Sequence, residues 1–412
     1  MKAVILAAGM GRRMGKSQPK PLVLLYGLPL IEHKIRKLKG FEIIVVYHDR
    51  RIKDYLNKKF PYVKTVYNPD PERENGFSLL CAKNFFKKGE KFVLLMADHF
   101  YDKGFYENIK EFPTTTLFVS KRCFQEDEAT KVKVSGEKII KIGKQLTDYD
   151  YFDTGFFVCD YAVFNYAEKL AKTSKKVYLS GVMQEVANDG KLGYFVIDKF
   201  WIDIDTENEL KIAEKYIRSS LVKKTDGFIS RYINRKISTR ITPFLLGYDF
   251  ITPNLLTVII SMLGVSAGVL MFFKQFLIGG LITQLVSILD GIDGEIARIK
   301  NISTRFGSVL DSVLDRYIDI TVLSGIYLSG IKSFYADIFF IMSVTGSILV
   351  SYVSHLTGKR PFFATRDIRL FIIMVICLFS YFGICEPFLI FPAIGIMTHT
   401  GVLYMIYKTK RG

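Results

Sequence analysis

Four aspartates in the C-terminal half have spacings that suit a metal site. Asp290 and Asp293 are three residues apart, and Asp311 and Asp315 are four residues apart. Residues at these spacings share one face of a helix, so two facing helices could direct all four carboxylates at one point. Hard divalent cations prefer oxygen ligands of this kind. The residues therefore predict a divalent-metal site built on a pair of helices.

The chain around these aspartates is largely apolar. Residues 281–289 precede them and residues 318–328 follow, and both stretches look membrane-embedded. Acids inside a membrane are costly and normally serve a function in a bundle interior or a wet cavity. The alternative is a set of solvated acids at helix ends, and the apolar neighbours argue against it. The small residues Gly294, Ala297 and Gly307 would let a ligand or a second helix approach the backbone closely.

The stretch from Asp290 to Asp315 resembles the signature of the CDP-alcohol phosphotransferases. The pattern is D-x-x-D-G-x-x-A-R, then eight residues, then G-x-x-x-D-x-x-x-D, and every defined position is matched. The resemblance implies that the first three aspartates mainly hold metal and that Asp315, in the same cluster, acts as general base. It also implies that the nucleotide lies against four residues of the signature: Gly294, Ala297, Arg298 and Gly307.

A glycine-rich turn follows a short apolar stretch at the N-terminus. Residues 2–8 read as a buried strand rather than a signal peptide, and Gly9, Gly11 and Gly15 follow. Such a turn lets backbone N–H groups surround phosphates. The dinucleotide fingerprint fails because Met14 stands where it needs glycine. The P-loop fingerprint fails because only three residues separate Gly11 from Gly15.

The pattern L-A-A-G-x-G-x-R, followed by P-K-P-L, instead resembles the sugar nucleotidyltransferases, which join an NTP to a sugar phosphate. The resemblance implies that the loop holds the triphosphate and that Arg13 and Lys20 neutralise it during attack. The loop residues implied to bind the nucleotide are Leu6, Ala7, Ala8, Gly9 and Gly11. The residues implied to recognise the base are Asn75, Gly76 and Ser78.

Two acids complete this first predicted site. Residues 92–96 form an apolar strand that leads to Asp98, and open α/β sheets bind ligands at the carboxyl ends of their strands. Asp203 matches the second metal aspartate of the family, so the two acids would hold one Mg²⁺. Asp205 reads as a cap of the following helix. His99 reads as a polar residue at the strand end.

The acceptor side of the first site has weaker signals. Lys144 and Asp153 lie where relatives bind the acceptor sugar phosphate. The alternative for Asp153 is a turn before a strand at 156–159, and the sequence leaves both interpretations open.

The 412-residue chain is long enough for more than one domain. Its first half alternates strand and helix patterns, whereas long apolar runs dominate after residue 250. We expect a Rossmann-like α/β nucleotidyltransferase domain with a mixed sheet at 1–218 and an all-α transmembrane domain of six helices at 251–412. Between them, residues 219–250 are basic with an apolar stripe, which predicts an amphipathic helix in the membrane interface. A solvated linker helix is the alternative.

Six apolar segments approach the length that spans a bilayer. They are residues 253–273, 276–297, 306–328, 334–357, 367–385 and 388–407. Lysine and arginine gather at one end of these segments, and the positive-inside rule then places both termini and both active sites on the cytosolic side of the cell membrane. On that side Arg360, Arg366 and Arg369 either set the topology or bind substrate phosphate. Their position beside the predicted phosphotransfer site favours phosphate.

The net charge of +17 could indicate a nucleic-acid partner. Much of the excess lies beside apolar runs, so membrane topology and anionic substrates explain it better, and we expect no nucleic acid. The five cysteines show no metal-ligand spacing and read as reduced cytosolic thiols. Half of the residues are hydrophobic, and the mean hydropathy is +0.20, which is high for a wholly soluble protein.

The two halves suit consecutive reactions, because the first would make a CDP-activated alcohol and the second would consume it. This fusion resembles the bifunctional inositol-1-phosphate cytidylyltransferase/di-myo-inositol-phosphate-phosphate synthases. The resemblance implies that CTP and inositol-1-phosphate give CDP-inositol and pyrophosphate. CDP-inositol and a second inositol-1-phosphate then give a phosphodiester and CMP. The resemblance further implies Mg²⁺, with Mn²⁺ as a substitute, in both domains, and a homodimer formed through the membrane domain in the lipid bilayer.

Two other functions stay open at this point. The phosphotransferase signature is shared by lipid and soluble donors, so the membrane half could be a phosphatidyltransferase of phospholipid synthesis. The first half could then be a sensor or scaffold. Its motif residues argue against decay to a scaffold, because all are intact: Gly9, Gly11, Arg13, Lys20, Asp98 and Asp203.

Overall fold

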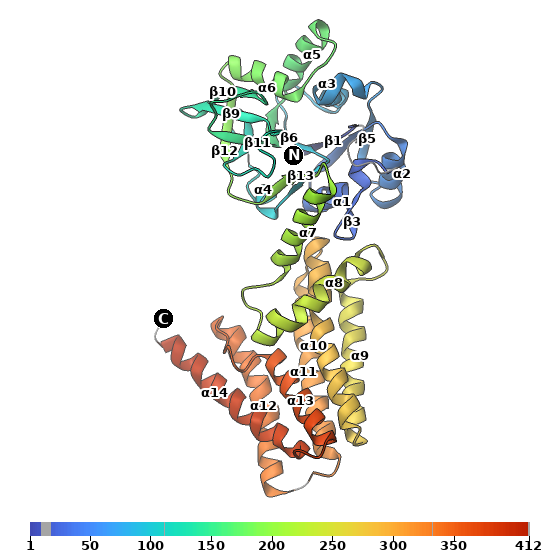
Figure 1. The fold of residues 1–412 in the computed structure, drawn as a ribbon, viewed down its shortest axis with the longest axis vertical. Coiled ribbons are helices and arrows are strands. Elements are labelled where there is room, and N and C mark those ends of the chain that lie inside the picture. Colours follow the sequence, from blue (N-terminus) through green and yellow to red (C-terminus); the bar gives the residue numbers. More distant parts are fainter. Residues whose placement is uncertain (10–17, 111, 332, 411–412) are drawn as a thin grey trace. The chain divides into compact units, whose positions relative to one another are not determined.

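The computed structural model describes residues 1–9, 18–110, 112–331 and 333–410 (Figure 1). Gly11 and Arg13 of the predicted triphosphate loop therefore lie outside the described residues. The chain divides into two compact units, Met1–Tyr216 and Ile217–Gly412.

A nine-stranded mixed sheet forms the centre of the first unit, in the order β5-β4-β1-β6-β11-β8-β12-β10-β9. Its parallel part consists of β1 (Lys2–Ala7), β4 (Glu42–Tyr47), β5 (Lys64–Tyr67) and β6 (Lys91–Met96). The long strand β11 (Tyr151–Asp160) runs antiparallel to β6. The remaining strands are β8 (Thr115–Ser120), β9 (Lys131–Ser135), β10 (Lys138–Gly143) and β12 (Leu192–Val196). The mixed α/β sheet predicted from the sequence is confirmed.

Helices cover both faces of this sheet. Along β1, Val4 and Leu6 belong to one core cluster, whereas Ala3 and Ile5 belong to the other. The first cluster is completed by α3 (Glu74–Cys81), α5 (Val163–Thr173) and α6 (Leu179–Asn188). The second is completed by α1 (Leu30–Lys37), α2 (Arg50–Lys59) and α4 (Lys103–Glu107). A parallel sheet buried on both faces reads as continuous apolar runs, as β4 and β6 do.

Two short ladders lie beside the main sheet. Strands β7 (His99–Tyr101) and β13 (Trp201–Asp203) pair antiparallel, and their register places His99 opposite Asp203. Strands β2 (Leu24–Leu25) and β3 (Leu28–Pro29) form a small hairpin after the 3₁₀ turn η2 (Lys20–Leu22). The helix α7 (Glu207–Leu221) follows β13. These ladders bring residues near 20, 98 and 203 together at the carboxyl end of β6.

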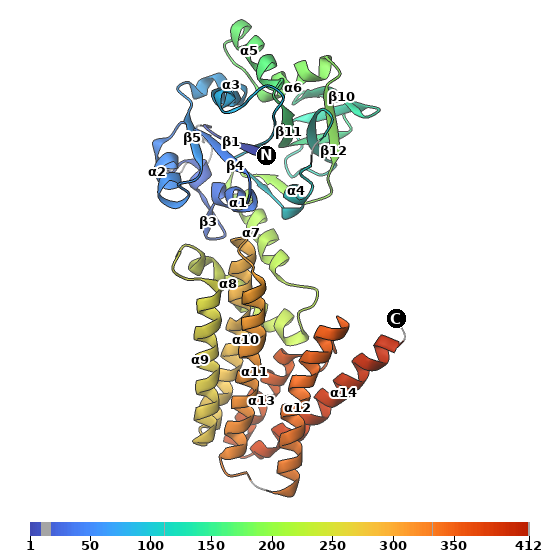
Figure 2. The ribbon, with the colours of Figure 1, turned by 180° about the vertical axis from the view of Figure 1, so that it is seen from behind.

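The second unit is helical (Figure 2). It begins with the π-helical turn η5 (Ser230–Asn234) and α8 (Arg235–Leu246). Six longer helices follow: α9 (Pro253–Phe272), α10 (Phe276–Ile299), α11 (Arg305–Leu328), α12 (Phe334–Thr357), α13 (Arg366–Tyr381) and α14 (Ile390–Lys410). Each of the six apolar segments predicted from the sequence is therefore largely helical. The last helix is preceded by a 3₁₀ turn, η6 (Pro387–Leu389).

Four of these helical segments are long and apolar enough to cross a membrane: Pro253–Phe272, Phe276–Ile299, Phe334–Thr357 and Pro387–Lys410. The other two predicted spans, α11 and α13, are not among these four, and the reason is different for each. Helix α13 has only 16 residues, and α11 carries a row of charged residues along its first half. Small residues allow close packing in this unit, since a Cβ on Gly325 of α11 would collide with the carbonyl oxygen of Gly268 on α9.

The juxtamembrane segment of residues 219–250, at the start of the second unit, presents its apolar stripe outward. Phe228, Tyr232 and Ile237 are exposed, whereas Asn234 and Ser238 are buried. A helix in a membrane interface needs such an exposed apolar face. A solvated linker helix would not bury its polar face in this way.

Two candidate active sites

The first site is a carboxylate cluster at the end of β6. Ligand atoms of Asp98, His99 and Asp203 all lie within 4.8 Å of one another. Lys20 reaches into this cluster from η2, and its Nζ lies 3.0 Å from Asp98, 3.3 Å from Asp203 and 2.7 Å from Asp205. The side chain of Lys20 is only 8% exposed, so this ammonium group is largely withdrawn from water. Asp205, predicted only as a helix cap, is thus part of the cluster.

The electrostatics of this cluster favour ionised carboxylates. Burial lowers the pKa of Lys20, but Asp98, Asp203 and Asp205 outweigh burial and raise it well above its usual range. Burial raises the pKa of Asp203, but His99 and Lys20 outweigh burial and hold it well below its usual range. For His99, burial lowers the pKa, and the carboxylates of Asp203 and Asp98 raise it to about 9. The Nδ1 of His99 lies 2.9 Å from the carbonyl oxygen of Thr154.

The donor set of this cluster fits a hard cation. Asp98 and Asp203 present carboxylate oxygens that are about one-third exposed, and oxygen is the ligand that Mg²⁺ prefers. The cation of Lys20 lies between the same carboxylates. The three carboxylates of Asp98, Asp203 and Asp205 exceed the positive charges of Lys20 and His99, so the cluster retains negative charge for a bound cation.

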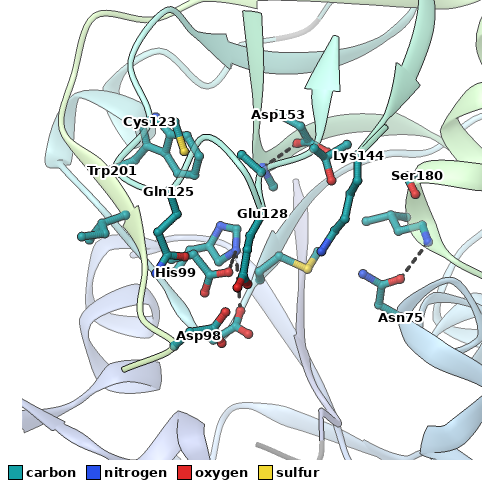
Figure 3. Close-up of a pocket in the computed structure, with 18 of the residues that line it drawn as sticks. Asn75, Asp98, His99, Cys123, Gln125, Glu128, Lys144, Asp153, Ser180 and Trp201 are labelled. Atoms are coloured by element: carbon teal, nitrogen blue, oxygen red, sulfur yellow. Dashed lines mark hydrogen bonds and ion pairs between the residues drawn. The ribbon is translucent and has the colours of Figure 1, made fainter. Parts of the chain in front are cut away.

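A cavity of about 320 Å³ opens beside these acids (Figure 3). The predicted residues Asn75, Lys144 and Asp153 line it together with Asp98 and Asp203. Sequence reasoning missed several polar residues of its wall: Glu74, Gln125, Glu128, Tyr178 and Ser180. They lie on loops or at helix ends and belong to no motif, so the sequence carried no signal for them.

Three residues predicted to recognise the base have different roles in the structure. The Oδ1 of Asn75 accepts a hydrogen bond from the backbone N–H of Leu179 at 2.7 Å. Gly76 packs against the chain at Val177, where a Cβ would lie 2.6 Å from the carbonyl oxygen. Ser78 is 5% exposed, and its Oγ accepts a hydrogen bond from Asn68. Of the three, Asn75 lines the cavity.

Asp153 takes part in a local turn and also borders the cavity. It lies within β11, and its Oδ1 accepts a hydrogen bond from the N–H of Gly155 at 2.7 Å, so it supports a local turn. It also lines the cavity. Burial raises the pKa of Asp153 to about 6, although the bond from Gly155 opposes this rise. Gly155 has φ +71°, and a Cβ there would lie 2.9 Å from the His99 ring.

The predicted triphosphate loop starts from a buried strand end. Leu6, Ala7 and Ala8 are all at most 7% exposed, and the carbonyl oxygen of Leu6 accepts a hydrogen bond from Ala97. Gly9 is exposed, and the loop then leaves the described part of the chain. The start of the loop therefore lies beside the strand end that carries Asp98.

The second site brings together carboxylates from α10 and α11. Those of Asp290, Asp311 and Asp315 lie within 4.8 Å of one another. Asp293 is 7% exposed and is held differently, because its Oδ2 accepts a hydrogen bond from Thr257 of α9 at 2.5 Å. All four acids line one cavity of about 400 Å³. Three clustered carboxylates suit a hard divalent cation, and the fourth borders the same space.

The three arginines predicted to bind phosphate have different partners. The Nη1 of Arg366 lies 2.7 Å from Asp315 and 3.2 Å from Asp290. Arg369 is 3% exposed and pairs with Asp319 at 2.8 Å, so its charge is committed to packing helix α13 on α11. Arg360 lines the cavity and donates only to the backbone carbonyl of Thr225, at 3.2 Å, among the described residues.

Three cations of this cavity have no carboxylate within salt-bridge distance in the part of the chain that the structure describes. They are Lys223, Arg298 and Arg360. Two nitrogens of Arg298, Nε and Nη2, are buried without any partner among the described groups. A Cβ on Gly294 would lie 2.9 Å from Arg298, so this glycine leaves room for the guanidinium group. Unpaired cations around a cavity are suited to binding phosphate.

The four other signature residues differ in their distance from this cavity. Gly294 and Arg298 line the cavity, but Ala297 and Gly307 are not part of its wall. The N–H of Gly307 donates to the Oγ1 of Thr304, which caps the start of α11. A Cβ on Gly307 would lie 3.0 Å from Asn254 of α9, so this position is tightly packed.

Comparison with known proteins gives the class of each half. A family model described as a MobA-like NTP transferase domain matches residues 3–112, and one described as CDP-alcohol phosphatidyltransferase matches residues 250–406. Fold and sites thus define an enzyme that joins a nucleotidyltransferase to a CDP-alcohol phosphotransferase. The second domain and its apolar helices associate the protein with a membrane.

Full-length relatives narrow this class. The "Bifunctional IPC transferase and DIPP synthase" of Aquifex aeolicus is 36% identical, over 99% of this chain and 98% of its own length. The protein of the same name from Thermococcus kodakarensis is 33% identical, over 98% and 96%. A solved structure, the inositol-1-phosphate CTP transferase from T. maritima, is 26% identical with a TM-score of 0.48, and covers 52% of this chain and 93% of its own. The chain belongs to the family of bifunctional IPC transferases and DIPP synthases.

Proposed function

We propose that this protein makes CDP-inositol from CTP and inositol-1-phosphate, and then transfers the inositol phosphate group to a second inositol-1-phosphate. The first step releases pyrophosphate, and the second releases CMP and gives di-myo-inositol phosphate phosphate. The observation that carries the proposal is the end-to-end similarity to relatives named as bifunctional IPC transferase and DIPP synthase. The two acidic clusters, one in each unit, are consistent with two separate phosphate chemistries.

Each acidic cluster is proposed to hold Mg²⁺, or Mn²⁺ in its place. Asp98 and Asp203 would hold it in the first unit, and Asp290, Asp293 and Asp311 would hold it in the second, with Asp315 beside them. When bound, the ion would stabilise the negative charge that moves to the leaving group.

In the first reaction a phosphate oxygen of inositol-1-phosphate attacks the α-phosphorus of CTP. The attacking phosphate is already ionised, so this step needs no general base. Lys20 would neutralise the triphosphate, and Arg13, outside the described residues, is proposed to do the same by family resemblance. Lys144 would bind the acceptor phosphate. The mixed donors and acceptors of Gln125, Glu128 and Ser180 suit the ring hydroxyls of a cyclitol.

In the second reaction a hydroxyl group of the acceptor attacks the phosphorus next to inositol in CDP-inositol, and CMP leaves. Asp315 would take the proton of this hydroxyl, which requires an ionised carboxylate. The Nη1 of Arg366 lies 2.7 Å from Asp315. Gly294 and Arg298 would bind the nucleotide, with Ala297 and Gly307 supporting the same helix ends.

The cellular setting is proposed from the charge distribution. Lysine and arginine gather at the ends of the predicted spans that carry the acidic cluster, which favours a cytosolic position for both termini and both active sites. We also propose a homodimer through the membrane domain, and domain limits of 1–218, 219–250 and 251–412.

One feature favours a second candidate, a lipid donor for the transfer reaction. An apolar groove of about 410 Å³ runs between α11 and α12 and includes Val313, Tyr317 and Ile348. It shares Ser312 and Arg316, among others, with the cavity of the second site. An acyl chain could lie in such a groove, so the structure leaves room for a phosphatidyltransferase.

Product analysis distinguishes the two candidates. Full-length protein would be supplied with CTP, Mg²⁺ and inositol-1-phosphate, and the products followed by ³¹P NMR after extraction with organic solvent. We expect pyrophosphate, CMP and a phosphodiester, all in the aqueous phase. A phosphodiester that appears only with added CDP-activated lipid, and partitions into the organic phase, would overturn the proposal in favour of the lipid enzyme.

The unpaired cations of the second site give a first prediction. Lys223→Ala and Arg360→Ala should each raise the KM for inositol-1-phosphate by roughly tenfold or more in the transfer reaction, because a charge-assisted hydrogen bond contributes about 1.5–3 kcal/mol. Arg369→Ala should instead lower thermal stability, since it leaves Asp319 buried without its partner. Steady-state kinetics with supplied CDP-inositol and thermal unfolding measure the two effects.

The matched control is Lys236→Ala, which removes an exposed lysine of the same segment that does not line the cavity. We expect this variant to keep the wild-type KM. An unchanged acceptor KM in both Lys223→Ala and Arg360→Ala would return these residues to the role of topology-setting charges.

A further inference from the structure

A fully buried acid lies inside the signature of the second unit, at a position that the signature leaves undefined. Glu295 of α10 is 0% exposed. Its carboxylate accepts hydrogen bonds from Arg235 at 2.8 Å, from Ser238 at 2.6 Å and from Thr242 at 2.5 Å. All three donors come from α8, within the juxtamembrane segment of residues 219–250. A buried carboxylate is tolerated when it is paired and hydrogen-bonded in this way.

Arg235, the partner of Glu295, also contacts the helical turn of α10 that carries Asp290 and Asp293. The Nη1 of Arg235 donates to the carbonyl oxygen of Gly291 at 3.1 Å, and Gly291 lies between Asp290 and Asp293. Its Nε and Nη2 pair with Asp226 at 2.9 and 3.3 Å. One guanidinium group therefore joins three points: the segment itself, the turn at Gly291 and the buried acid one turn further along α10.

The identity of Gly291 is explained by the same contact. A Cβ at this position would collide with the guanidinium group of Arg235. Because Gly291 has no side chain, Arg235 can lie directly against the backbone between two aspartates of the site. Sequence spacing alone did not single out Gly291, Arg235 or Glu295.

Further contacts fix the segment to the same helices. The amide of Asn234 donates to the Oγ of Ser287 at 2.9 Å, and the backbone N–H of Ser230 donates to Asp367 of α13 at 2.7 Å. Lys223 and Asp226 line the cavity that holds the four aspartates. The segment is thus one wall of the second site.

We propose that Arg235, with Glu295 as its buried partner, is a positioning residue of the second site. It holds the turn of α10 that carries Asp290 and Asp293. The juxtamembrane segment therefore helps to set the geometry of the phosphotransferase site. The inference rests on the proposed function in one respect, that these aspartates bind the metal ion of the transfer reaction. Groups that orient metal ligands typically change metal affinity or activity by about 10–100-fold when they are removed.

Gly291→Ala is the sharpest test, because it displaces Arg235 without removing a charge. Alanine favours a helix over glycine by about 1 kcal/mol, so the substitution should not weaken α10 by itself. Mg²⁺ affinity would be measured by titration calorimetry in full-length protein carrying Asp98→Asn, which removes a first-site ligand. We expect Gly291→Ala to weaken Mg²⁺ binding about tenfold or more and to lower kcat for CMP release from supplied CDP-inositol. Gly247→Ala, at an exposed position with no atom within 4 Å of its Cβ, is the matched control and should change neither.

A double variant separates positioning from stability. Arg235→Met alone leaves Glu295 buried without a charged partner and should destabilise the protein. Arg235→Met combined with Glu295→Met removes both buried charges of this pair, while Asp226 loses the same partner in both variants, so the double variant should recover part of the thermal stability lost by Arg235→Met. If positioning is the role, Mg²⁺ affinity stays low in the double variant although part of the stability returns. Recovery of wild-type affinity there, or wild-type affinity in Gly291→Ala, would overturn the inference. A parent protein that neither binds Mg²⁺ at the second site nor releases CMP would instead contradict the proposed function.

Discussion

Asp315→Asn is expected to lower the turnover of the transfer reaction by at least about a hundredfold, the low end for loss of an acid–base group. Asparagine keeps the size of the side chain and one acceptor oxygen, but it cannot take the proton of the attacking hydroxyl. Mg²⁺ affinity should remain near normal, because Asp290 and Asp311 still provide the clustered carboxylates. Turnover with supplied CDP-inositol, measured against Mg²⁺ concentration, tests both statements.

The other aspartates of the site are the natural controls. Asp290→Asn, Asp293→Asn and Asp311→Asn should raise the Mg²⁺ requirement, and extra Mg²⁺ should restore part of their rate. Removal of a general base cannot be compensated in this way. If the rate of Asp315→Asn recovers at high Mg²⁺, then Asp315 is a metal ligand like the others, and the proton must leave by another route.

Lys20→Ala is expected to lower pyrophosphate release by the first site about 10²–10³-fold, the usual effect of removing one preorganised electrostatic contact to developing charge. Transfer from supplied CDP-inositol should be unchanged. Without metal, the variant should also unfold at lower temperature than wild type, because Asp98, Asp203 and Asp205 lose the ammonium group that lies among them. Added Mg²⁺ should then raise its unfolding temperature more than it raises that of wild type.

Lys133→Ala provides the comparison for Lys20. Lys133 also pairs with two acids, Asp148 and Asp150, but exposed pairs of this kind contribute little to stability. We expect wild-type pyrophosphate release from it. Wild-type pyrophosphate release from Lys20→Ala would contradict the role assigned to Lys20.

Regular sequence patterns predicted much of the architecture. Apolar runs predicted the buried strands at 2–8 and 92–96 and the helices of the second unit, because burial on both faces and membrane embedding both require them. Residues that share a helix face could likewise be paired in advance, as with Asp311 and Asp315. The structure then placed these two acids beside Asp290, a partner on another helix.

Contacts between separate helices could not be read from spacing. Thr257 holds Asp293 from 36 residues away, and Arg235 reaches Glu295 from 60 residues away. No local periodicity encodes which side chain on a second helix will meet a given carboxylate. The same limit applies to the arginines. Arg360 and Arg369 look alike in the sequence, but of these two only Arg369 forms an ion pair with a buried acid, Asp319.

The place of a residue in a motif also did not predict how that residue packs in the fold. Gly76 and Ser78 lie where relatives recognise the base, yet in this chain they support the turn around Asn68 and Val177. The juxtamembrane segment gives a similar case. Its apolar stripe was visible in the sequence, but the burial of its polar face against α10 depends on Glu295, which reads in isolation as a solvated helix residue.

The central claim is that one chain carries two active sites that act in sequence, and Asp98→Asn tests it most directly. Full-length Asp98→Asn, with Mg²⁺, CTP and inositol-1-phosphate, should give neither pyrophosphate nor phosphodiester. Addition of CDP-inositol to the same sample should restore CMP release and phosphodiester formation at the wild-type rate, because the second site has its own acids. A folded Asp98→Asn protein that still cannot use supplied CDP-inositol would contradict two separable sites, as would one that still releases pyrophosphate from CTP.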